Sequence, residues 1–150
     1  MQLGVAMSES VTLNGLQSSA VAPATAAVAP SSGVRRISVL GATGSIGQST
    51  LDLIGRSGGD FEVEVLTANA DAEKLARLAI AHRARVAVVA DPAAYPALVA
   101  ALAGTGIEAA AGPEALVEAA SRPADCVVAA IVGAAGLPPT IAAVRQGRRI

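Results

Sequence analysis

The apolar positions between residues 35 and 150 follow two alternating patterns. Short, continuous apolar runs, many of them β-branched, predict strands that are buried on both faces. Between these runs, apolar residues recur at the i, i+3, i+4, i+7 spacing of an amphipathic helix. The runs predict strands at 35–40, 61–68, 85–90, 107–112 and 126–133, and "RRI" at 148–150 is typical of the first half of a further strand.

A helix is predicted after each strand. The first begins near Ser45 and ends at "RSGGD" (56–60), and the last two are expected within 112–121 and 137–147, where proline stands near the start. The apolar faces of the first three are expected to contain, in chain order, Ile46, Thr50, Leu53 and Ile54; Leu75, Leu78, Ala79 and His82; and Tyr95, Leu98, Val99 and Leu102.

The alternation of strands and helices determines the predicted fold class. Strands that are apolar on both faces belong to parallel sheets covered by helices on both sides. We therefore expect residues 35–150 to form one α/β domain, a Rossmann-like doubly wound parallel sheet.

Residues 1–34 differ from the rest of the chain. They are rich in Ala, Ser, Val and Pro, carry Glu9 as their one charge and show no sustained period. A secretory signal would have a basic start and a continuous apolar core, and a transit peptide would be rich in Arg. We expect a disordered leader, or a start codon placed too early, rather than a targeting signal.

Composition narrows the function classes. The chain is 53% hydrophobic and 15% charged with a net charge of −1, so charge gives no argument for nucleic acid or an anionic membrane as a partner. No apolar run reaches the roughly 20 residues of a membrane span. The single cysteine, Cys126, excludes an internal disulfide.

Three glycines follow the first predicted strand in "ISVLGATGSIGQST" (37–50). In a doubly wound fold this loop lies at the carboxyl edge of the sheet, where ligands bind. Gly41 would permit the turn out of the strand, Gly44 would let a phosphate approach the backbone, and Gly47 would let the helix pack tightly. The N–H groups at the start of that helix, with the hydroxyls of Thr43 and Ser45, can donate to the phosphate. A tight turn without a ligand is the alternative.

The type of dinucleotide stays open on the local residues. NAD-specific folds place an acidic residue at the end of the second strand to hold the ribose 2′-hydroxyl. Here that position is occupied by Asn69, which weakens the case for NAD. Asp71 would repel a 2′-phosphate if it faced one, and Lys74 lies five residues beyond Asn69, where a helix is predicted.

Two segments, "GATGSIGQSTLDLI" (41–54) and "AAIVGAAGLPPTIAAVRQGRRI" (129–150), resemble the N-terminal domain of 1-deoxy-D-xylulose 5-phosphate reductoisomerases. The resemblance runs from about Arg36 to Ile150. It implies an NADPH-dependent rearrangement and reduction of the sugar phosphate to 2-C-methyl-D-erythritol 4-phosphate in isoprenoid biosynthesis. It also implies that Thr43, Gly44, Ser45 and Ile46 bind NADPH. The family often has a basic residue where this chain has Ala70.

The resemblance has implications beyond these residues. In the family, the strand beginning at "RRI" continues into an Asn-Lys-Glu segment, and a catalytic domain with a divalent metal, Mg or Mn, follows. We therefore expect a fragment that by itself binds cofactor weakly at most and does not turn over, with no catalytic or metal-binding residue of its own. The full-length enzyme is expected to be a cytoplasmic homodimer. The alternatives are another reductase with the same glycine loop, such as one resembling aspartate-semialdehyde dehydrogenase, and a non-catalytic dinucleotide-binding module.

A few other polar and small residues are candidates for structural or functional roles. His82 is expected to cap a helix or to be partly buried, and Cys126 to be a small core residue. Glu62 and Glu64 alternate with apolar residues along the second strand and are expected to be solvated together. Gly133 and Gly136 are expected at the same sheet edge as Gly41, either making a tight turn or lining the nicotinamide side of the cofactor groove.

Overall fold

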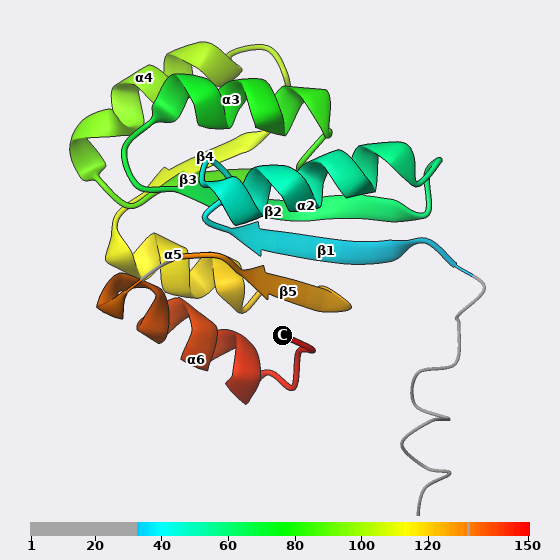
Figure 1. Ribbon diagram of the computed structural model, residues 1–150. Coiled ribbons are helices and arrows are strands. Elements are labelled where there is room, and N and C mark those ends of the chain that lie inside the picture. Colours follow the sequence, from blue (N-terminus) through cyan, green and yellow to red (C-terminus); the bar gives the residue numbers. More distant parts are fainter. Residues whose placement is uncertain (1–32, 132) are drawn as a thin grey trace, which may run out of the picture. The chain divides into compact units, whose positions relative to one another are not determined.

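The computed structural model describes residues 33–131 and 133–150. The predicted leader falls on residues 1–34, and its first 32 residues lie outside the described part of the chain. Gly33 and Val34 precede the first strand as exposed residues. Figure 1 shows the described residues as a sheet with helices above and below it.

The sheet is parallel throughout. Its strands are β1 (Arg35–Leu40), β2 (Phe61–Ala68), β3 (Val86–Val89), β4 (Glu108–Ala111) and β5 (Cys126–Ala129), in the spatial order β4-β3-β2-β1-β5. Every pairing along this order is parallel. The predicted parallel sheet is therefore confirmed.

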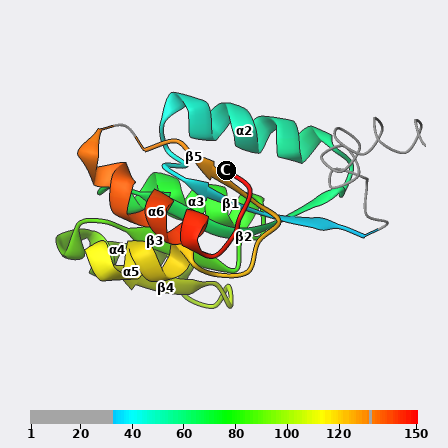
Figure 2. The same cartoon turned by 90° about the horizontal axis from the view of Figure 1, so that it is seen from below.

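The helices divide between the two faces. Three of them, α2 (Ser45–Arg56), α3 (Ala72–Ala81) and α4 (Tyr95–Leu102), lie on one face, while α5 (Pro113–Ala120) and α6 (Leu137–Arg145) lie on the other (Figures 1 and 2). Short 3₁₀ turns, η1 (Pro92–Ala94) and η2 (Ala134–Gly136), precede α4 and α6. The chain moves outward from β1 to β4 and then returns to the far side of β1. Because crossovers are right-handed, this reversal places the later helices on the opposite face, which confirms the doubly wound fold.

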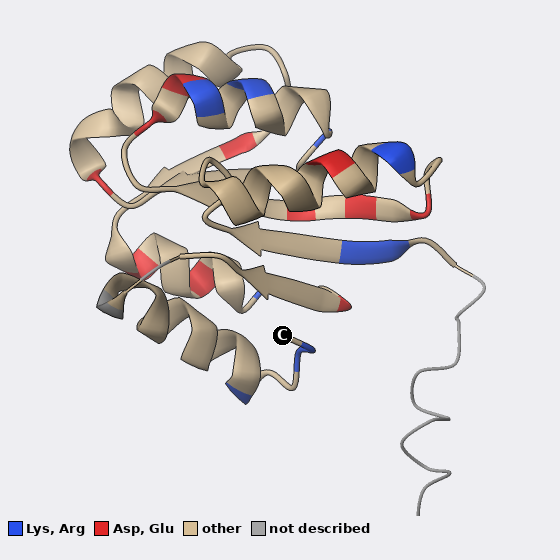
Figure 3. Ribbon diagram, viewed as in Figure 1, with Lys and Arg blue, Asp and Glu red and all other residues tan. Residues whose placement is uncertain are grey.

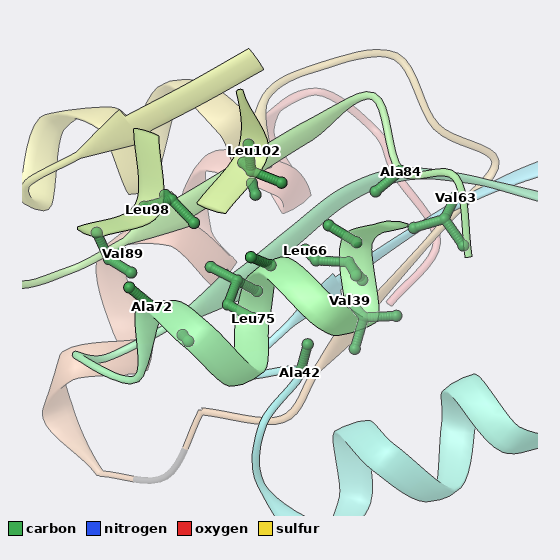
Figure 4. Packing of buried hydrophobic residues seen from close by; sticks show 14 of the residues in the cluster. Val39, Ala42, Val63, Leu66, Ala72, Leu75, Ala84, Val89, Leu98 and Leu102 are labelled. Carbon is green, nitrogen blue, oxygen red and sulfur yellow. The ribbon is translucent and has the colours of Figure 1, made fainter. Parts of the chain in front are cut away.

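Each face of the sheet has its own apolar layer. Under α2, α3 and α4, side chains of β1, β2 and β3 meet those of the helices, as in Figure 4, where Val39, Leu66, Val89, Leu75 and Leu98 are labelled. On the other face, two smaller clusters lie under α5 and α6; they are built around Leu40, Val127 and Ala143, and around Val65, Val88 and Leu116. The core is aliphatic, as the scarcity of aromatic residues requires.

A β-bulge in β2 overturns one prediction. Ile37 pairs with Val63 but the next residue of β1, Ser38, pairs with Val65, so Glu64 is the extra residue. Glu64 was expected to be solvated with Glu62, and this is wrong: Glu64 is 3% exposed. Its carboxylate lies inside because the Arg122 guanidinium is 3.0 Å from Oε1. Beyond the bulge the alternation is reversed, so Val63 and Val65 pack on opposite faces.

The predicted apolar face of α2 is partly wrong. The buried residues of this helix are Gly47 and Leu51, whereas Ile46 and Leu53 are 61% and 67% exposed. Gly47 and Leu51 are four residues apart and share one face of the helix, and Gly47 lets that face approach the loop before it closely. In α4, similarly, Leu98 and Leu102 are buried as predicted, while Tyr95 and Val99 are exposed.

The fifth strand is shorter than predicted. It spans Cys126–Ala129 rather than 126–133, and residues 130 and 131 continue as loop. It is also only partly buried. On the far side of β5, Cys126 forms a parallel bridge with Arg149, and the Val127 N–H donates to the Arg149 carbonyl at 2.7 Å. The strand pairing expected at "RRI" therefore begins at Arg149.

Candidate functional site

The loop after β1 is tied to the end of β2. The Gly41 N–H donates to Thr67 Oγ1 at 2.9 Å, and the Ala42 N–H donates to the Thr67 carbonyl at 2.7 Å. Gly41 has φ +89°, and a Cβ there would lie 2.7 Å from the Ala130 carbonyl oxygen. Only glycine fits this turn, because both the backbone angle and the neighbouring backbone at Ala130 exclude a side chain.

The two later glycines face different surroundings. A Cβ on Gly47 would lie 2.2 Å from the Gly41 carbonyl oxygen, so this glycine allows α2 to pack against the loop. A Cβ on Gly44 would meet only the Gly41 carbonyl oxygen, at 3.7 Å, which is ordinary contact. The fold itself therefore does not require glycine at 44. What glycine provides there is an open approach to the backbone from outside.

The start of α2 is suited to an anion. Gly44 is its N-cap, no side chain caps the helix, and its first turn contains no acidic residue. By contrast, α3 begins with Asp71 as an N-cap whose carboxylate accepts the Lys74 N–H at 3.0 Å. Uncapped N–H groups and the positive end of the helix dipole favour a phosphate at α2.

A cavity of about 310 Å³ lies beside this loop at the carboxyl edge of the sheet. Its lining residues come from the ends of several strands and from α5, and none of them carries a charge: Gly41, Thr43, Gly44, Ala68, Asn69, Ala90, Leu116, Ala130, Ile131 and Ala135. The cavity has the location, next to a topological switch point, at which doubly wound folds bind ligands. It is mostly apolar with a few convergent polar groups, as ligand sites usually are.

A cation reaches this loop from the next helix. Lys74 Nζ donates to the Thr43 carbonyl at 3.2 Å, and Gln48 Nε2 donates to the same oxygen at 3.0 Å. Lys74 is in the first turn of α3, and its side chain crosses from there to the glycine loop. Sequence reasoning missed this contact, because it placed Lys74 on the helix and away from the site.

The four residues predicted to bind cofactor occupy the loop and the first turn of α2. Thr43 and Gly44 line the cavity, while Ser45 and Ile46 are exposed residues at the start of the helix, outside the lining. Asn69, which stands where NAD-specific folds have an acidic residue, also lines the cavity.

Gly133 and Gly136, which follow β5, are explained by the local backbone. A Cβ on Gly136 would lie 2.7 Å from the Ile131 carbonyl oxygen, and Gly133 has φ +80° in the turn before η2. The lining on this side consists of Ala130, Ile131 and Ala135 instead. The geometry favours the turn over the groove as the reason for glycine at 133 and 136.

His82 and Cys126 lie away from this cavity. His82 is the C-cap of α3, is partly buried, and burial lowers its pKa, with the Asp52 charge acting in the opposite direction. Cys126 is a half-buried free thiol in β5. In residues 33–131 and 133–150, no group of three or more His, Cys, Asp or Glu side chains is placed to hold a metal ion. The described helices include none that is long and apolar enough to cross a membrane.

Comparison with known proteins gives one consistent family. Residues 37–150 match the family model of 1-deoxy-D-xylulose 5-phosphate reductoisomerase. The enzyme of that name from Rhodopseudomonas palustris (strain BisB18) is 59% identical over 119 residues, which are 79% of this chain and 29% of that protein. The one from Ruegeria pomeroyi is 56% identical over 114 residues, 76% of this chain and 29% of that protein.

Solved structures agree with this comparison. The reductoisomerase from Zymomonas mobilis in complex with NADPH superposes with a TM-score of 0.75 at 54% identity, over 77% of this chain and 30% of that one. A further reductoisomerase, in complex with NADPH, fosmidomycin and magnesium, gives a TM-score of 0.73 at 38% identity, over 78% of this chain and 29% of that one. The chain thus spans about 30% of the length of the relatives it matches.

Proposed function

Because the chain belongs to the 1-deoxy-D-xylulose 5-phosphate reductoisomerase family, we propose that it is the NADPH-binding part of such an enzyme. The whole enzyme converts the sugar phosphate to 2-C-methyl-D-erythritol 4-phosphate in isoprenoid biosynthesis. Bound NADPH supplies the hydride for this reduction. The contribution of these residues is to bind and orient the dinucleotide.

The observation that carries the proposal is the open backbone at Gly44. The chain keeps glycine where the fold would accept a side chain, at the uncapped start of α2 and beside a cavity at the carboxyl edge. A phosphate seated there would receive N–H groups from the first turn of the helix. This is the cradle that a Cβ would begin to fill, and it fits the pyrophosphate of NADPH.

Within that cradle, the roles of the four site residues differ. The N–H groups of Ser45 and Ile46 belong to the first turn, which has no intrahelical acceptors for them, and they would donate to the pyrophosphate. The Thr43 and Ser45 hydroxyls would add donors. Gly44 would let the phosphate approach the backbone closely.

The metal and the sugar phosphate are assigned to other residues. The described part of this chain has no group of three or more His, Cys, Asp or Glu side chains placed to hold Mg or Mn. On this proposal the chain alone binds NADPH and does not turn over. The whole enzyme would be a cytoplasmic homodimer.

Binding is the direct test. Titration of the purified chain with NADPH, followed by NADPH fluorescence and by calorimetry, should show saturable binding. Gly44→Val should remain folded, because Gly44 is exposed and a Cβ there meets only ordinary contact in the loop. The variant should weaken binding at least about tenfold by occupying the phosphate position. Ser49→Val, which adds the same side chain at an exposed position of α2, is the matched control.

Two results would contradict the proposal. One is a folded wild-type chain, with a cooperative thermal transition, that binds neither NADPH nor NADP⁺. The other is a Gly44→Val variant that binds NADPH as tightly as the Ser49→Val control, because the cradle would then not be the site.

A further inference from the structure

The end of β2 and the start of α3 have a charge arrangement that bears on which dinucleotide binds. Asn69, the first residue after β2, is neutral and lines the cavity. Folds that select NAD use an acidic residue near this point to hold the ribose 2′-hydroxyl. The chain therefore lacks the usual feature by which a 2′-hydroxyl is chosen over a 2′-phosphate.

The nearest acid, Asp71, is already engaged. Its Oδ1 accepts the Lys74 backbone N–H at 3.0 Å as the N-cap of α3. A carboxylate in this position is held against the positive end of its helix, which offsets its charge. Asp71 thus repels a nearby phosphate less than a free carboxylate would.

The Lys74 side chain extends from α3 toward the glycine loop. It crosses from α3 to the glycine loop, where Nζ donates to the Thr43 carbonyl at 3.2 Å. An ammonium has three donors, so two remain for another acceptor. Lys74 makes no ion pair with any carboxylate in residues 33–131 and 133–150. Its positive charge is therefore not neutralised by the described part of the protein.

The loop does not depend on Lys74 for its shape. Gln48 Nε2 also donates to the Thr43 carbonyl, at 3.0 Å, and Thr67 accepts the N–H groups of Gly41 and Ala42. Gln48 therefore duplicates the structural contact of Lys74. The positive charge of Lys74 has no carboxylate partner in the described residues and lies beside the loop proposed to bind phosphate, so it is available to a phosphorylated ligand.

Building on the proposed function, we infer that Lys74 is the residue that selects NADPH over NADH in this chain. Its ammonium, held between the start of α3 and the glycine loop, would donate to the 2′-phosphate of the adenosine ribose. Lys74 is the only lysine in the sequence, and its substitution leaves the phosphate cradle at Gly44 intact.

The test compares two cofactors on four forms of the 150-residue chain. Wild type, Lys74→Gln, Lys74→Arg and Arg77→Gln are each titrated with NADPH and with NADH. Loss of a charged hydrogen bond to phosphate should weaken NADPH binding by Lys74→Gln about 10- to 100-fold, with NADH affinity unchanged within about twofold. Lys74→Arg should restore most of the preference. Arg77 is an exposed cation one turn later on α3, and its variant should behave as wild type.

Other outcomes separate the inference from the function on which it rests. If Lys74→Gln lowers NADPH and NADH affinity by the same factor, or leaves the preference unchanged, the assignment of Lys74 is wrong while the binding function stands. If folded wild type binds neither dinucleotide, both proposals fail. The same comparison can be made without the nicotinamide half of the cofactor, by titrating adenosine 2′,5′-bisphosphate and adenosine 5′-monophosphate. Lys74→Gln must weaken binding of the bisphosphate by the same factor as binding of NADPH.

Discussion

The two edges of the sheet are built from different residues. At the carboxyl edge, the residues lining the cavity are small or neutral, and glycine leaves the backbone open. At the amino edge, charged side chains flank the starts of the strands, as Figure 3 shows for β1 and β2. One sheet thus has an edge suited to a ligand and an edge occupied by the protein's own ion pairs.

Ion pairs at the amino edge, which we name the amino-edge network, join charged residues of β1, β2 and β4 with Arg85 and Arg122. Glu62 of β2 lies 4.0 Å from Arg36 of β1 and 3.4 Å from Arg85, which precedes β3. The Arg122 guanidinium, 3.0 Å from Glu64, also approaches Glu108 of β4 at 3.9 Å. Most of these groups are half exposed and contribute little each, since water screens them. Glu64 is the exception, because it is buried.

This difference between the edges predicts that changes in stability and changes in ligand binding can be separated in this fold. Polar groups at the amino edge have partners within the protein, so removing one should alter folding and leave the cavity unchanged. At the carboxyl edge, α2 has no side-chain cap, and on the proposed function its first N–H groups donate to the cofactor, so changes there should alter affinity. Substitutions at either edge test whether stability and affinity change separately.

The largest expected effect is at Glu64. Glu64→Ala removes the buried carboxylate that both Arg122 and Arg85 approach, and leaves these arginines only their contacts with the more exposed Glu108 and Glu62. The free energy of unfolding should therefore fall by about 3 kcal/mol. This is the lower part of the range for broken buried pairs, because the Arg122 side chain is 34% exposed. Urea unfolding measures the loss, and NADPH affinity should not change.

Glu62→Ala is the control for that prediction. Its carboxylate belongs to the same network but is 49% exposed, and its loss should cost less than about 1 kcal/mol. Equal losses for the two variants would mean that burial of Glu64 at the bulge does not matter. A large fall in NADPH affinity with Glu64→Ala would contradict the separation of stability from ligand binding.

The intermediate effect is at Thr67, where one substitution should lower both stability and NADPH affinity. Its hydroxyl accepts the Gly41 N–H at 2.9 Å, and the side chain is fully buried. Thr67→Val would leave that N–H without an acceptor, which should cost about 1–2 kcal/mol of stability. Because Gly41 begins the glycine loop that is proposed to bind the cofactor, NADPH affinity should fall as well. Thermal unfolding and titration of the same sample measure both effects.

Thr67→Ser keeps the hydroxyl and is the matched variant for the loop. It should retain NADPH affinity even if the lost methyl group lowers stability. If the serine and valine variants bind NADPH equally, the hydrogen bond to Gly41 does not position the loop.

How far the sequence predicted these two edges depends on the range of the interactions. The strands from β1 to β4 and the glycine loop were predictable, because apolar runs and the Gly41 turn are local patterns. The bulge at Glu64 was not, since "FEVEV" is an ordinary alternation and the burial of Glu64 depends on Arg122, 58 residues away. Lys74 escaped prediction for the same reason, since its contact with Thr43 spans 31 residues. The face of α2 was wrong because Gly47, which has no apolar side chain, sets the helix orientation.

The smallest expected effect is the pH dependence due to His82, which lies between α3 and the amino-edge end of α2. Burial lowers its pKa from the ordinary 6.5, with the Asp52 charge opposing this. The unfolded chain therefore binds more protons than the folded one at pH values between the lowered pKa and 6.5. Stability should be constant above that window and fall as the pH falls through it.

Two measurements isolate this effect of His82. Since it is the only histidine, an NMR titration of its ring reports the folded-state pKa directly, and Asp52→Asn should lower that pKa further by removing the opposing charge. Urea unfolding between about pH 5 and pH 8 should then show a slope that His82→Gln reduces. Because His82 lies outside the cavity, the ratio of NADPH to NADH affinity should be the same in His82→Gln as in wild type. A ring pKa above 6.5 would show that the Asp52 charge, and not burial, governs this residue.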